Sequence, residues 1–70
     1  MTREEFDNTV WEEVKKCPES WRTGQAVFNV IDSIFGVART VQFQDHVDCF
    51  YNDDAIQEFM DKAWIRYQML

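Results

Sequence analysis

Residues 37–51 read Val-Ala-Arg-Thr-Val-Gln-Phe-Gln-Asp-His-Val-Asp-Cys-Phe-Tyr, and this stretch decides the predicted fold class. Its first part, residues 37–43, is rich in β-branched side chains and alternates apolar with polar residues at its end. A second apolar run, residues 47–51, follows after a short polar turn. Two such runs separated by a short turn are typical of a β-hairpin, so the stretch predicts two antiparallel strands.

The length of the turn sets the register of this hairpin. A two-residue loop would set Phe43 opposite Asp48. A one-residue slip moves every side chain to the other face, so the apolar pattern favours a three-residue loop, Gln44–His46. That loop requires a left-handed conformation at His46, which glycine adopts more readily. It places these apolar side chains on one face: Val41, Phe43, Val47, Cys49 and Tyr51.

A first helix is expected over residues 3–16. Thr2 followed by Glu5 matches a capping box, in which each residue satisfies the other's backbone amide. The Pro18 region ends the helix, because the residue before a proline avoids the helical conformation. The apolar side chains lie along one face, which the fold should bury: Phe6, Val10, Val14 and Cys17.

Two further helices are expected on either side of the hairpin, over residues 21–35 and from residue 52 or 53 to 67. Ser20 is the expected cap of the earlier helix, and Gly36 lies where a left-handed residue commonly ends a helix. Apolar side chains cover more than half the circumference of the 21–35 helix. It is therefore expected to be the central, most buried helix.

The predicted fold class is thus α+β, in the order α-α-β-β-α, with a β-hairpin packed on three helices. The 70 residues are expected to form a single domain, 1–70. A chain of this length buries only about 60% of its unfolded surface. The 46% apolar content, with six Phe, three Trp and two Tyr, predicts a core dense enough to compensate.

The charge balance narrows the classes of partner. Thirteen acidic residues against seven basic ones give a net charge of -6, which repels phosphate backbones and anionic lipids. Nucleic-acid binding is therefore not expected, and a basic protein surface fits better. No apolar run approaches the roughly 18 residues of a membrane span, and no signal-peptide pattern is present. The sequence predicts a cytoplasmic protein whose two cysteines, Cys17 and Cys49, are packed thiols.

The densest cluster of chemically versatile side chains is Asp45, His46, Asp48 and Cys49. Carboxylate, imidazole and thiol groups all ligate metals, but their spacing matches no zinc pattern. A Cys/His pair for nucleophilic catalysis also needs an oxyanion-stabilising site, and nothing in the sequence marks one. We expect no enzyme activity, no metal and no cofactor.

A binding surface is predicted at the start of the 21–35 helix. Gly24 in the first turn costs roughly 1 kcal/mol relative to alanine in a helix interior, which suggests that a backbone or a ligand approaches closely there. Arg22, Gln25 and Asn29 follow at three- and four-residue steps and form a polar stripe on an apolar helix. With Trp21 or Tyr51 beside it, this stripe is the predicted recognition surface.

Two spaced motifs carry a resemblance to known proteins: Arg22-x-Gly24-Gln25-x-x-Phe28-Asn29 and Asp48-x-Phe50-Tyr51-x-Asp53. From Arg22 to its end, the chain resembles a group of short bacterial and phage proteins that have no assigned activity. Many members have proline where this chain has Cys49, and proline there favours a turn. The resemblance implies a protein that binds a host or accessory protein, and it carries over no catalytic roles.

The predicted function is therefore a non-enzymatic module that binds a protein partner, of unknown identity, through an acidic surface with aromatic anchors. It is expected to be associated with phages or mobile elements, and a homodimer is an alternative assembly. A second hypothesis is a small-molecule or nucleotide-binding domain, in which Arg22 and Gln25 meet a phosphate at the helix start. A third is an enzyme that uses the cluster at residues 45–49.

Overall fold

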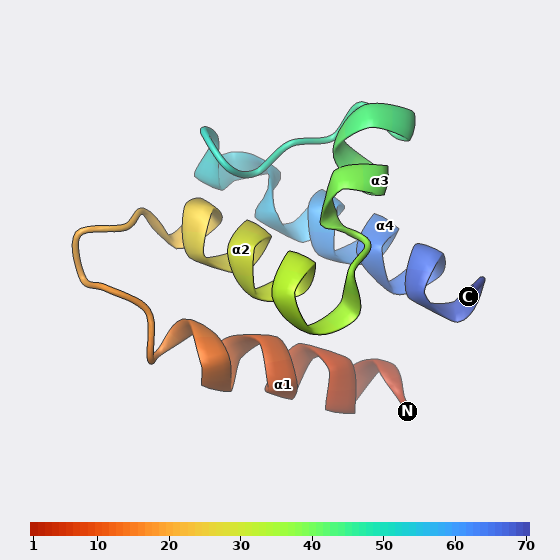
Figure 1. The fold of residues 1–70 in the computed structure, drawn as a ribbon, viewed down its shortest axis with the longest axis horizontal. Coiled ribbons are helices and arrows are strands. Elements are labelled where there is room, and N and C mark those ends of the chain that lie inside the picture. Colours follow the sequence, from red (N-terminus) through yellow and green to blue (C-terminus); the bar gives the residue numbers. More distant parts are fainter.

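The computed structural model describes residues 1–70, and every regular element in it is a helix (Figure 1). Helix α2 lies at the centre, with α1 along one side and α3 and α4 on the other (Figure 1), and it also contacts the short 3-10 helix η1. The elements, in chain order, are α1 (Arg3–Val14), α2 (Thr23–Phe35), α3 (Ala38–Gln44), η1 (Asp53–Ala55) and α4 (Ile56–Gln68).

The predicted α+β class is wrong, because no β-hairpin forms. The first strand was expected over residues 37–43, but residues 38–44 form helix α3. The second was expected over residues 47–51, which lie in an irregular connection, residues 46–52. The register question therefore does not arise. His46 does have a positive φ of 58°, but there it follows the end of α3 instead of closing a hairpin.

The pattern that suggested a strand is also compatible with a helix. Val37, Ala38 and Val41 are all buried, and their spacing brings them to one side of a helix. Seven residues contain too few turns for the two periods to be told apart, and β-branched propensity yields readily to packing. Phe43 and Tyr51, which the hairpin would have placed on its apolar face, are exposed.

The start of α1 confirms the predicted capping box. The Thr2 hydroxyl accepts from the Glu5 amide at 3.1 Å, and the Thr2 amide donates to the Glu5 carboxylate at 2.7 Å. These bonds to Thr2 lower the pKa of the Glu5 carboxyl. The helix ends at Val14, two residues before the predicted end.

Helix α2 begins differently from the prediction. Ser20 does not cap it: the cap residue is Arg22, whose side chain makes no capping bond. A distant carboxylate compensates, because Asp53 accepts from the amide of Gly24 at 2.9 Å. At the other end Gly36 has φ 70°, and its amide donates to the Ile31 and Asp32 carbonyls, which confirms the predicted left-handed end.

Helix α4 completes one hydrophobic core. Asn52 caps η1 by accepting from the Asp54 amide at 3.0 Å, and α4 follows directly. In the core, the fully buried Phe6 ring lies 4.7 Å from the Phe35 ring and 5.4 Å from the Trp64 ring, centroid to centroid. Phe6 thereby joins α1, α2 and α4. None of the helices has the length and apolarity needed to cross a bilayer.

A bidentate ion pair links Asp45, directly after α3, to Arg66 of α4. Arg66 donates through Nε and Nη2 to the two oxygens of Asp45, at 3.1 and 2.8 Å. These bonds hold the pKa of the Asp45 carboxyl below its usual value. The pair fixes the point where the chain leaves α3 and enters the irregular connection.

Candidate functional site

The two spaced motifs in the sequence lie against each other at the start of α2. The Cys49 Sγ donates to the Gly24 carbonyl at 3.3 Å, and the Gly24 amide donates to the Asp53 carboxylate. The Arg22 guanidinium donates to the Phe50 carbonyl. A Cβ on Gly24 would lie 2.0 Å from the Cys49 carbonyl oxygen. The glycine therefore serves close approach of the chain's own backbone, one of the two possibilities raised by the sequence.

Further contacts fix residues 48–52 in place. The Phe50 ring packs edge-on against Phe28 of α2 at 5.5 Å. The Phe50 amide donates to the Asp48 carboxylate at 2.8 Å, and the Asn52 amide donates to the Cys49 carbonyl at 3.3 Å. The segment has no sheet partner, and the Asp48 and Arg22 side chains and one bond within the segment bind part of its backbone. The exposed Tyr51 therefore extends from a segment that these contacts hold against α2.

Beside this segment is a depression of about 280 Å³, which we name the aromatic groove. Two of its side chains are unusually exposed for their size: Phe43 is 70% exposed and Tyr51 is 75% exposed. Solvent-exposed aromatic rings beside a surface depression are typical of protein interaction sites. The groove is lined by Phe28 from α2, Arg39, Gln42 and Phe43 from α3, and Phe50 and Tyr51 from the connection.

The two arginines that are least neutralised by carboxylates lie at or beside the aromatic groove: Arg39 lines it, and Arg22 contacts Tyr51, which lines it. Arg22 lies over the Tyr51 ring, 5.6 Å from its centroid, in a cation–π contact. Arg39 meets a carboxylate only at 3.8 Å, from Nε to Asp32 Oδ2. Four other basic residues each contact a carboxylate within 3.3 Å: Arg3, Lys15, Lys16 and Arg66.

The predicted recognition stripe does not form one surface. Arg22 and Tyr51 lie together at the aromatic groove. Trp21 and Asn29 instead line a second depression of about 370 Å³. Gln25 is half-buried and lines neither of them. The stripe divides because Asn29 of α2 lies beside Glu13 and Lys16 at the end of α1, whereas Arg22, just before α2, bonds to the Phe50 carbonyl.

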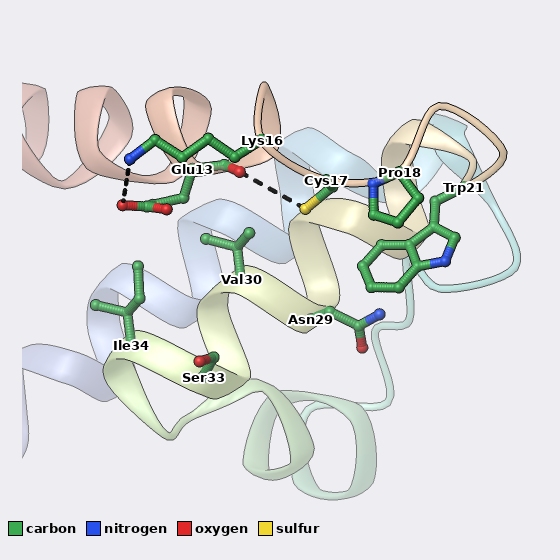
Figure 2. A pocket seen from close by; sticks show the side chains of 9 residues that line it. All are labelled: Glu13, Lys16, Cys17, Pro18, Trp21, Asn29, Val30, Ser33 and Ile34. Carbon is green, nitrogen blue, oxygen red and sulfur yellow. Dashed lines mark hydrogen bonds and ion pairs between the residues drawn. The ribbon is translucent and has the colours of Figure 1, made fainter.

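The second depression, the α1–α2 groove, is larger but less suited to recognition. Trp21 lies beside Pro18 at one end of it and Ile34 at the other (Figure 2). Its charged groups are already paired, with Lys16 Nζ 3.3 Å from the Glu13 carboxylate. Ile34, 45% exposed, is the one large apolar side chain there that solvent reaches well. We therefore place the candidate site at the aromatic groove.

The cluster at residues 45–49 is dispersed. Asp45 is bound by Arg66, the side chain of His46 is exposed, and Asp48 accepts from the Phe50 amide. Cys49 is fully buried, and burial raises the pKa of its thiol to about 12. A thiol in this state is not a nucleophile near neutral pH. Nowhere in the chain do three or more His, Cys, Asp or Glu side chains come together as metal ligands.

The state of Cys49 leads to a prediction about reactivity. In a Cys17→Ser variant, the remaining thiol should react with a thiol reagent at pH 8 only at the rate at which the protein opens. Added urea should then accelerate labelling toward the rate of the unfolded chain. In the wild type the half-buried Cys17 should react first. Fast labelling of folded Cys17→Ser protein would contradict the buried position of Cys49.

The same thiol makes stability depend on alkaline pH. Folding raises the pKa of Cys49 from its usual 9.0 to about 12. Between these values the folded protein retains a proton that the unfolded chain has lost. The free energy of unfolding should therefore be unaffected by this group below about pH 9 and should fall as pH rises toward 12. Urea titrations across this pH range should show that the free energy of unfolding falls less with pH in Cys49→Ala than in the wild type.

Sequence reasoning missed Phe43 and Arg39 as site residues. They are four positions apart, so one turn of α3 brings them to the same exposed face. The signal was present: if Ala38 and Val41 face the core of a helix, Phe43 lies about 140° away from Ala38. It was hidden because a strand at the same residues sends Phe43 to the buried side.

Comparison of this chain with protein-family models, with curated proteins and with solved structures gave no match.

Proposed function

We propose that this chain is a non-enzymatic interaction module that binds a protein partner at the aromatic groove. The observation that carries the proposal is the pair of exposed rings, Phe43 and Tyr51, that line one depression. Aromatic anchors around a hollow are the typical energetic centre of protein interfaces. Tyr51 was among the predicted site residues; Phe43 replaces Trp21 as the second anchor.

Contacts within the chain hold the floor of the aromatic groove in place before any partner binds. Phe50 packs on Phe28, and Arg22 holds the Phe50 carbonyl, so the base of the groove is already ordered. A partner would not have to order this segment on binding, and ordering is one of the main costs of association. This pre-organisation supports recognition of a protein segment over a purely structural role.

The nucleotide-binding alternative has weaker support. Its site was the start of α2, with Arg22 and the helix amides meeting a phosphate. There the Gly24 amide donates to the Asp53 carboxylate, and Arg22 donates to the Phe50 carbonyl. The donors that a phosphate would use are therefore already bonded within the chain. This alternative stays a prediction, as do the cytoplasmic location and the association with phages or mobile elements.

The test is affinity capture from bacterial lysates, with and without phage infection, at low and high salt. Wild-type protein should retain a stoichiometric partner, and a Phe43→Ser/Tyr51→Ser variant should retain at least about tenfold less, as expected for interface anchors. A matched control is Ile65→Ser/Met69→Ser, which removes two exposed apolar side chains at the far end of α4. Equal loss in both double variants, or in neither, would refute the groove as the binding face.

A further inference from the structure

The local charge of the aromatic groove differs from that of the whole chain. The chain carries a net charge of -6, but the one charged side chain that lines the groove is Arg39, and Arg22 lies over the ring of Tyr51, which also lines it. At physiological salt, charges farther away than about 8 Å are largely screened. A segment seated in the groove therefore responds to Arg22 and Arg39 more than to the distant acids of α1.

The nearby carboxylates are engaged by the chain itself. Asp53 accepts from the Gly24 amide, and Asp48 accepts from the Phe50 amide. Asp32 is the carboxylate nearest to Arg39, and their 3.8 Å separation is too long for a hydrogen bond. Arg39 is 77% exposed, so its guanidinium is free to turn toward a ligand. Its guanidinium group, which carries five N–H donors, makes no hydrogen bond within the chain.

Resting on the function proposed above, we propose that the groove takes an acidic, apolar segment of a partner protein. A large apolar side chain of that segment inserts between Phe43 and Tyr51, over Phe28 and Phe50. An Asp or Glu next to it pairs with Arg39, in the forked geometry that guanidinium and carboxylate groups share. This reverses the expectation of a basic partner, which rested on net charge alone.

The probe is a display library of random 12-residue peptides, selected against the wild-type chain. Enriched peptides should combine an aromatic or large aliphatic residue with an adjacent Asp or Glu. Their synthetic forms should lose at least about tenfold in affinity on Arg39→Glu, as for a truncated interface hot spot. Arg39 gives a cleaner test than Arg22, whose side chain also holds the Phe50 carbonyl.

The matched control is Lys15→Glu on α1. Lys15 is 71% exposed, close to the 77% of Arg39, and it lies outside the groove. Both substitutions change the net charge by the same amount, so a general field effect would weaken binding equally. Circular dichroism and melting temperature of each variant establish that the fold is intact.

The outcomes separate this inference from the proposed function. Peptides that need Phe43 and Tyr51 but lack acids, or that ignore Arg39→Glu, would overturn the acidic-segment inference and leave the groove as a binding face. No enrichment, or peptides indifferent to Phe43→Ser, would overturn both. A dimer in sedimentation that Phe43→Ser dissociates would assign the groove to a second copy and also overturn this inference.

Discussion

A Gly24→Ala variant should lose about 2–3 kcal/mol of its free energy of unfolding, although alanine is the better helix former by about 1 kcal/mol. The added Cβ would lie 2.0 Å from the Cys49 carbonyl oxygen and 2.7 Å from an Asp53 carboxylate oxygen. The first of these atoms is backbone and cannot rotate away. The 49–53 segment must move off α2, which breaks the Gly24–Asp53 and Cys49–Gly24 bonds. Urea unfolding followed by circular dichroism measures the loss.

The chain supplies a matched control in its other glycine. Gly36 has no atom within 4 Å of a built Cβ, but its φ is 70°. Gly36→Ala should therefore cost only about 1–2 kcal/mol, from backbone conformation alone. Labelling of Cys49 distinguishes the two causes. It should become faster in Gly24→Ala, where the segment is displaced, and should change in Gly36→Ala only as far as global stability changes. If Gly24→Ala were as stable as the wild type, the contact between Gly24 and the Cys49 carbonyl would not be tight.

Phe6→Ala should remove about 3–5 kcal/mol, the usual effect of deleting a buried ring. A chain of 70 residues has a total stability on the order of 4–10 kcal/mol, so the variant should be partly or wholly unfolded at 37 °C. The cause is geometric: the Phe6 ring contacts Phe35, Trp64 and Tyr67, and it joins three helices. Thermal melting should move down by roughly 12 °C or more, at about 4 °C or more per kcal/mol.

Phe43→Ala makes the same chemical change at an exposed position and serves as the control. It should change stability by less than about 0.5 kcal/mol, as surface substitutions usually do. If Phe43→Ala destabilised the chain as much as Phe6→Ala, Phe43 would belong to the core and the groove would lose its anchor. The pair thus tests the division between the side chains that hold the fold and those left for recognition.

Much of the helical framework follows from the sequence alone. The capping box at Thr2, the left-handed end at Gly36 and a helix ending near Tyr67 all depend on neighbouring residues, and the structure has them as predicted. Long apolar repeats specify which face of a helix is buried. These features need no knowledge of what lies opposite, because local chemistry and periodicity determine them.

The candidate site was only partly predictable. The close approach at Gly24 and the involvement of Arg22 and Tyr51 were recognisable from residue type and spacing. The separation of Trp21 and Asn29 from them was not, because it depends on which element packs on each side of α2. Phe43 and Arg39 could be assigned only once α3 was known to be a helix.

By itself, the sequence determined that α1, α2 and α4 form, to within a few residues of their ends, and the left-handed turn at Gly36. Only the tertiary structure decided the state of residues 37–51. That stretch is short, its β-branched residues favour a strand, and its alternation fits a sheet face. What makes it a helix followed by an irregular connection is packing: Val37, Ala38 and Val41 enter the common core, and Cys49 and Asp53 bond to Gly24. These partners come from distant parts of the chain, and burial against them outweighs a local preference of less than about 1 kcal/mol per residue.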